Sequence, residues 1–261
     1  MTLLLRAGLG AALSLLLMHP ASAQWQGKAG LGVRGVSHTE NDSAGRRLVR
    51  ETGALPGIAL HLAYTSGPLT WFGEADWYRG DIGYRGQTQA GTAAASTTAT
   101  GLAALRLGAS YAVRNGYSAK AAVEIDDWKR DIRSTGKSVG LQERYRSERL
   151  IVGMGKAWHL PGSVVAADLA VVFSTPERMR VGFSGLLDAT SLKTKASRGI
   201  RLGAAYRPGF APSLELRASF DWIRIARSED APVTRNGQFA GTVAQPEHAR
   251  RAVTLNLSTR F

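Results

Sequence analysis

Residues able to do chemistry are few in this sequence and widely spaced. Its 261 residues include five histidines and no cysteine, so thiol catalysis and cysteine-ligated metal sites are excluded. After His19, the remaining histidines are His38, His61, His159 and His248, and no two have the spacing of metal ligands. The nucleophile motif Gly-x-Ser-x-Gly is absent as well. The sequence therefore predicts no catalytic residue, no metal site and no cofactor.

Two of these histidines have carboxylates close by in sequence. Asp42 follows His38, and Glu247 directly precedes His248. Two carboxylates and a histidine can act as general acid and base, so a hydrolytic site built from these residues is one alternative. The acidic pair at 126–127 lies beside Lys129 and Arg130, which favours salt bridges over a metal site.

The N-terminus predicts export. A basic start at Met1–Arg6 precedes an apolar run at 7–18 and the small-residue ending Ala21-Ser22-Ala23. This order is typical of a cleaved secretory signal peptide, and the apolar run is too short to span a membrane. We therefore expect a signal peptide at 1–23 and a mature domain at 24–261.

A period of two dominates the mature sequence. At the C-terminus, Val253, Leu255, Leu257 and Phe261 share one apolar face, and polar residues occupy most of the positions between them. The segment, with its terminal phenylalanine, resembles the C-terminal signature of bacterial outer-membrane barrels. The resemblance implies that it is the closing strand and is read by the barrel-assembly machinery.

Ten such segments recur along the chain, each about as long as the 9–11 residues with which a tilted strand crosses a bilayer. Four connections are short and rich in Gly, Pro and Asn, including the type I′ signal Asn115-Gly116. Five are long, at about 38–53, 80–99, 132–145, 175–197 and 227–248. The alternation of short turns and long loops predicts an all-β fold, a transmembrane antiparallel up-and-down β-barrel of about ten strands in the cell outer membrane. A soluble β-sandwich or lipocalin-like barrel is the alternative, because it would show the same period.

The face opposite the apolar one carries charges of both signs. A barrel of ten strands is narrow, so these side chains should pair inside it. We predict a lumen ion-pair network of Glu74, Asp76, Arg106, Lys120, Glu124, Asp126, Asp168, Arg201, Glu215, Arg217 and Asp221. A narrow conduction path between acidic and basic ladders is the alternative.

The formal charge of +13 concentrates in the predicted long loops. Lipopolysaccharide phosphates lie at that level of the outer leaflet, and arginine and lysine pair well with them. We predict a lipopolysaccharide-facing basic rim of Arg130, Arg133, Lys137, Arg144, Arg146, Arg149, Lys193, Lys195 and Arg198. Merely solvated loop charges are the alternative. Export and the absence of a nucleic-acid motif exclude nucleic acid as the partner.

Strand number, loop lengths and size resemble the omptin proteases of the outer membrane. In that family, a pair of aspartates and an Asp–His pair face each other across the barrel mouth and activate water. Glu74-Ala75-Asp76-Trp77 resembles the family's Asp-x-Asp-Trp but departs at its first acid, and the predicted fourth long loop has no histidine.

Three function classes remain open from the sequence. A porin-like or non-enzymatic surface protein is favoured, and we expect a monomer, although the sequence does not fix the oligomeric state. An omptin-like protease or other hydrolase is the second class. An adhesion or envelope-assembly barrel that binds polysaccharide or lipopolysaccharide is the third.

Overall fold

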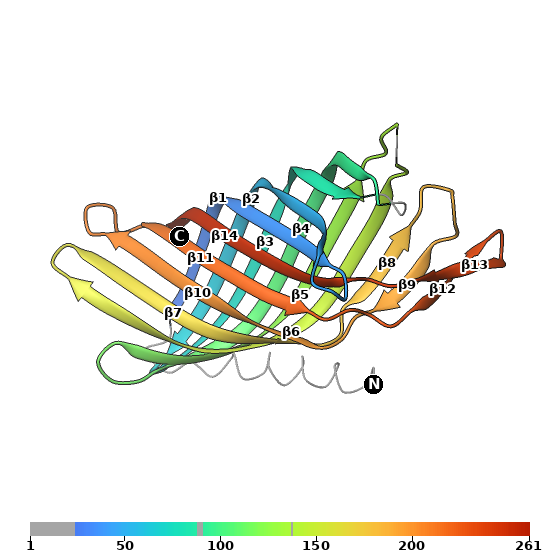
Figure 1. The fold of residues 1–261 in the computed structure, drawn as a ribbon. Helices are drawn as coiled ribbons and strands as arrows, with labels where there is room; N and C mark the ends of the chain where they lie inside the picture. The colour runs from blue at the N-terminus through green and yellow to red at the C-terminus, as the bar shows by residue number, and fades with distance from the viewer. Residues whose placement is uncertain (1–23, 88–90, 137) are drawn as a thin grey trace.

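Ten antiparallel strands close into a barrel (Figure 1). The computed structural model describes residues 24–87, 91–136 and 138–261, so the predicted signal peptide and Lys137 lie outside the described residues. The predicted fold class is confirmed. Around the wall the strands are β1 (Gln24–Asn41), β2 (Arg47–Ser66), β3 (Leu69–Gln87), β4 (Ala93–Ala112), β5 (Tyr117–Ile132), β6 (Leu141–Leu160), β7 (Ser163–Ser174), β10 (Ser197–Pro208), β11 (Leu214–Ile225) and β14 (Glu247–Arg260).

One end of the barrel, called the turn end below, holds the start of β1, the end of β14 and the short connections between strands. β14 pairs with β1, where Arg260 lies opposite Lys28, and this pairing closes the wall. Asn115 and Gly116 both have positive φ, 58° and 78°, as a type I′ turn between two twisted strands requires. No helix among the described residues is long and apolar enough to cross a membrane.

The outer surface carries an apolar belt. Leu60, Leu107, Val152 and Leu255 lie on different strands, and each is roughly half exposed. On the closing strand, Val253, Leu255, Leu257 and Phe261 all point outward, as the alternation predicts. Because the side chains between them point into the barrel, the apolar face of each strand has no protein partner and is suited to lipid.

The opposite end, here the extension end, differs from the prediction. The predicted long loops are largely strand: β1 and β2 are separated only by residues 42–46, and β3 continues to Gln87. The alternation persists there, but its outward face is polar, with Arg79, Asp81 and Arg85 exposed on β3. The prediction was wrong because it looked for an apolar outward face, which strands that pass beyond the belt do not need.

Two hairpins extend this end further. One is formed by β8 (Arg178–Gly182) and β9 (Thr190–Lys193), and β8 also pairs with the upper part of β6. The other is formed by β12 (Ala231–Arg235) and β13 (Gln238–Val243). Both project past the barrel wall (Figure 1). The first hairpin contributes Met179, Val181 and Leu192 to an apolar cluster that also contains Trp128 on β5 and Tyr145 on β6.

Candidate functional site: the charged lumen

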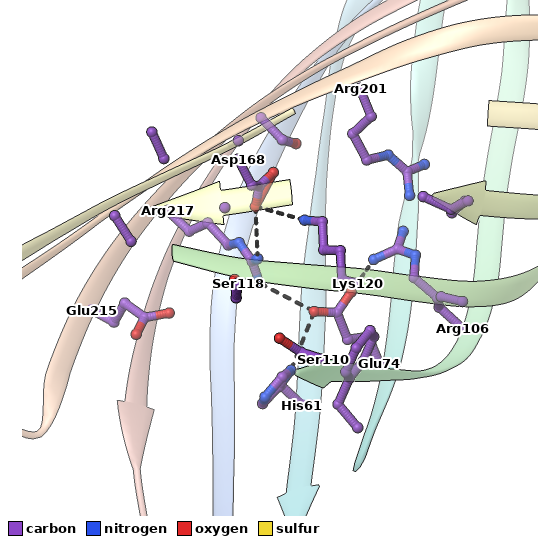
Figure 2. A pocket seen from close by; sticks show the side chains of 18 of the residues that line it. His61, Glu74, Arg106, Ser110, Ser118, Lys120, Asp168, Arg201, Glu215 and Arg217 are labelled. Atoms are coloured by element: carbon purple, nitrogen blue, oxygen red, sulfur yellow. Dashed lines mark hydrogen bonds and ion pairs between the residues drawn. The ribbon is translucent and has the colours of Figure 1, made fainter. Parts of the chain in front are cut away.

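The lower lumen, near the turn end, holds a layer of paired charges. Lys120 Nζ lies 2.9 Å from Asp168 Oδ1. Arg217 reaches both Glu74, at 3.1 Å, and Asp168, at 3.7 Å. Figure 2 shows these side chains pointing toward one another from different strands. Glu215 accepts two hydrogen bonds from Lys28 Nζ, at 2.7 and 2.8 Å.

A middle plug fills the lumen above that layer. It consists of Arg34, Arg106, Glu124, Arg149, Arg201 and Asp221. Glu124 is its centre, with a side chain only 1% exposed. Its carboxylate lies 2.5 Å from Arg106, 3.1 Å from Arg149 and 2.9 Å from Arg201. Three guanidinium groups from three strands therefore meet at one buried carboxylate.

The plug forms an unbroken chain of ion pairs through the barrel. From Glu74 on β3 it passes through Arg106 and Glu124 to Arg201 on β10. Arg201 also pairs with Asp221 on β11, which lies 3.2 Å from Arg34 on β1. The chain therefore links strands of opposite walls.

Two predicted lumen acids lie beside the plug. Asp126 lies 2.9 Å from Arg149. Asp76 lines the cavity below the plug; it forms no ion pair with any residue that the structure describes.

An upper cluster lies nearer the extension end. Arg130 contacts Glu40 at 3.2 Å, Glu51 at 2.9 Å and Glu143, and its side chain is 1% exposed. The hydroxyl of Tyr145 donates to Glu143 at 2.9 Å. Three carboxylates thus share one buried guanidinium.

The two histidines with neighbouring acids belong to this cluster. The rings of His38 and His248 lie 5.3 Å apart between centroids. His38 lies 2.9 Å from Glu40, and His248 lies 3.4 Å from Glu177. Their partners are thus Glu40 and Glu177, in place of the sequence neighbours Asp42 and Glu247.

The upper cluster lies beyond the apolar belt, because the outward apolar series ends at Ile125 on β5 and Val253 on β14. There, burial and the nearby Arg130 lower the pKa of His38 to about 3. Burial, together with the charge of Glu40, raises the pKa of Glu143 to about 7. Burial alone would raise the pKa of Glu177, but Arg250 and His248 hold it at about 2.

Access limits the chemistry of this cluster. His38 is 3% exposed and His248 is fully buried, so no substrate reaches either ring in this conformation. Within the described ranges, no three histidine or acidic side chains are arranged to hold a metal ion. The arrangement can fix the barrel walls, and among the described residues of this cluster neither histidine is exposed together with a carboxylate.

Two residues of the predicted basic rim lie inside the barrel, which corrects the prediction. Arg130 belongs to the buried upper cluster, and Arg149 lies in the plug with a side chain 9% exposed. Both occupy inward positions of β5 and β6, just outside the predicted loop at 132–145. The other predicted rim residues that the structure describes are exposed: Arg133, Arg144, Arg146, Lys193, Lys195 and Arg198.

Sequence reasoning missed most of the upper cluster. Glu40 and His248 are direct register partners, as are His38 and Arg250. The alternation of Glu143, Tyr145 and Arg149 along β6 was a usable signal. It was hidden because those positions fell partly in a predicted loop.

Comparison with known proteins identifies the fold of this chain but assigns it to no family. The sequence matches no protein-family model and no curated protein. The outer membrane protease OmpT from Escherichia coli is similar in structure, with TM-score 0.63 and 12% identity over 94% of this chain and 99% of that chain. The translocator domain of the autotransporter NalP from Neisseria meningitidis has TM-score 0.47 and 12% identity, over 98% and 95%. The first likeness shows that this chain has an outer-membrane β-barrel fold.

The local likeness to omptins does not extend to a mouth-level site. Glu74 lies deep in the lumen, where it is held by His61, Arg106 and Arg217. No histidine faces Glu74 from the extension end among the described residues. Glu74 and Asp76 of this motif therefore line the lumen, whereas Trp77 points outward and is 50% exposed.

Proposed function

We propose that this chain is an integral outer-membrane protein with a closed lumen, a surface barrel and not a channel. The turn end is taken to face the periplasm and the extension end the exterior, as short turns and long extensions do in this class. The observation that carries the proposal is the ion-pair chain centred on Glu124, whose side chain is 1% exposed. The upper cluster around Arg130 adds a second closed layer.

Planar-bilayer recording tests the closed lumen. The purified protein should give no steady single-channel current, because two layers of buried ion pairs leave no continuous water path. Insertion is verified separately, by resistance of the bilayer-embedded strands to protease. Sizeable steady currents from inserted protein would instead support the porin-like class.

A basic face just above the apolar belt supports a second proposal, contact with lipopolysaccharide. Five exposed cations lie on the outward face of three adjacent strands, interspersed with the acids Asp127, Asp131 and Glu148; the cations are Lys129, Arg144, Arg146, Arg178 and Arg180. Arg144 and Arg146 are fixed by Asp127, at 2.7 and 2.8 Å. Guanidinium groups held at this height suit the phosphates of lipid A.

Binding to lipopolysaccharide in mixed micelles tests this face. The variant with Arg144→Gln, Arg146→Gln and Arg178→Gln should bind several-fold more weakly, and dephosphorylated lipopolysaccharide should abolish the difference. Arg79→Gln with Arg85→Gln removes exposed charge on β3, outside those three strands and outside the predicted basic rim, and serves as the control. Equal binding by both variants and the unaltered protein would reject the basic face as the contact.

A further inference from the structure

A cavity of about 660 Å³ occupies the lower lumen. It begins near Val113 and Gly116, in a connection of the turn end, and extends up to Arg201 and Asp221 of the plug. Figure 2 shows charged side chains converging on it from several strands. Its volume falls in the range of roughly 300–1,000 Å³ that small-molecule sites occupy.

The cavity exists because one wall is lined by small side chains. Gly155 and Ala157 on β6, Ala166 on β7 and Gly203 on β10 all line it. Ala157 and Ala166 are direct register partners, so two neighbouring strands present only methyl groups at this level. A lumen serving packing alone would be filled here by larger side chains, as narrow barrels usually are.

Three cations gather around Glu215, which lines the cavity; of the three, Lys28 lines it as well. Lys28, Arg207 and Arg260 all lie near Glu215 Oε2, at 2.7, 3.4 and 4.0 Å. Three positive charges therefore share one carboxylate. Arg207 and Arg260 come from β10 and β14, the two neighbours of β11, which carries Glu215, and Lys28 comes from β1, the next strand beyond β14.

Two of these cations are only loosely paired. The side chains of Arg207 and Arg260 are 28% and 22% exposed, and Glu215, at 3.4 and 4.0 Å, is the one ion-pair partner of each among the described residues. A partly exposed guanidinium group with a distant partner can bind an anionic oxygen by charge-assisted hydrogen bonds. The charge excess and the loose pairing thus point to the same kind of ligand.

Solvent reaches this layer from the turn end. The side chains of Arg217 and Arg207 are 37% and 28% exposed, whereas Glu124 in the plug above is 1% exposed. A small solute can therefore enter from the turn end and is stopped by the plug.

We infer that the lower cavity is a binding site for a small organic anion bearing carboxylate or phosphate groups. Its charged groups lie against Lys28, Arg207 and Arg260, and its body lies along the alanine and glycine wall. The entrance faces the periplasm if the proposed orientation is right. The site itself does not depend on whether the lumen conducts, so this inference and the closed-lumen proposal can fail separately.

Calorimetric titration of the protein in uncharged detergent micelles tests the site, with citrate and glycerol 3-phosphate as separate probes. Saturable binding of either probe is expected, and glycerol, which is uncharged, should not bind. Binding of citrate alone identifies a carboxylate site, and binding of glycerol 3-phosphate alone identifies a phosphate site.

Two variants locate the binding. Arg207→Gln with Arg260→Gln keeps the Lys28–Glu215 pair and should weaken binding by roughly tenfold or more, since hydrogen bonds to charged groups are lost. Ala166→Leu changes no charge but fills the cavity, and it should abolish binding. Arg144→Gln with Arg146→Gln, on the outer basic face, should bind as the unaltered protein does.

Three results would overturn the inference. These are no saturable binding of either probe, undiminished binding by folded Ala166→Leu, or a loss of binding in the outer-face variant that matches the loss in the lumen variant. If the double arginine variant does not fold, Ala166→Leu decides alone.

Discussion

At the residue scale, the charges of the lumen are organised around single carboxylates. Glu124 faces three arginines in the plug, whereas Glu40, Glu51 and Glu143 surround one arginine in the upper cluster. The plug is thus locally rich in positive charge and the upper cluster in negative charge. Removing the shared group therefore leaves unpaired positive charge in the plug and unpaired negative charge in the upper cluster.

Glu124→Gln should destabilise the barrel strongly. The change leaves Arg106, Arg149 and Arg201 without their common counter-ion in a site nearly free of water. Breaking a buried ion pair on one side costs about 3–5 kcal/mol. Urea unfolding in micelles measures the loss.

Asp127→Asn is the matched control for Glu124→Gln. Asp127 also binds two arginines, but Arg144 and Arg146 are 44% and 60% exposed. Exposed pairs contribute roughly 0–1 kcal/mol, so this variant should lose little. Equal losses in the two variants would contradict the buried character of the plug.

Glu143 should make stability depend on pH near neutrality. Its pKa is raised from 4.5 to about 7 because burial and Glu40 oppose its ionisation. The folded protein therefore holds a proton that the unfolded chain has lost, and stability falls as the pH rises from about 4.5 to about 7.

Glu143→Gln removes this dependence, because the amide stays neutral. Relative to the unaltered protein, the variant should gain stability at pH 8 compared with pH 5. His38 acts in the opposite sense: its lowered pKa of about 3 means that its contribution is lost as the pH falls from about 6.5 to 3. Midpoints of urea unfolding measured at several pH values separate the contribution of Glu143 from that of His38. A pH profile unchanged by Glu143→Gln would show that this carboxyl does not titrate there.

At the element scale, alternation in the sequence predicts the belt but not its extensions. Inside the belt, lipid requires every outward side chain to be apolar, so strands such as 165–173 are evident from sequence. Beyond it, the outward face is polar and the inward face mixes charged residues such as Arg130 with apolar ones such as Trp128, so pairing with neighbouring strands defines the strand. Arg130 and Arg149 were therefore assigned to the outer basic rim, although β5 and β6 place them inside.

The candidate site, too, could be predicted from the sequence only in part. The pairing of Lys120, Asp168 and Arg217 involves residues that the alternation had already turned inward. The meeting of His38 with His248 depends on the register between β1 and β14, at opposite ends of the chain. A single sequence contains no measure of that register.

Leu169→Arg tests the belt at one position. Leu169 lies midway along the outward face of β7 and is 48% exposed. An arginine near the bilayer midplane of a barrel costs about 2–4 kcal/mol. Gln142→Arg, outward on β6 beyond the belt, should change the free energy of unfolding by less than about 0.5 kcal/mol. Unfolding in lipid bilayers gives both values, and equal costs would place the membrane elsewhere.

At the scale of the whole molecule, the usual arrangement of a folded protein is inverted. The large apolar side chains of the wall point outward, and the charged ones fill the interior as paired layers. A buried apolar cluster that includes Trp128, Tyr145 and Met179 lies at the extension end, and two smaller ones, around Ile151 and around Tyr78, lie inside the barrel. The barrel wall therefore depends on its surroundings for its main apolar contacts.

Folding should consequently require micelles or a bilayer. In water, a belt encircling the barrel would expose far more apolar surface than the few hundred Å² that soluble monomers tolerate. Urea-unfolded protein is diluted into one detergent below and above its critical micelle concentration. Strand circular dichroism and a heat-modifiable gel shift should appear only above that concentration. A monodisperse, strand-rich protein in detergent-free buffer would mean that the outward apolar face has a protein partner, and it would overturn the membrane assignment together with the proposals that depend on it.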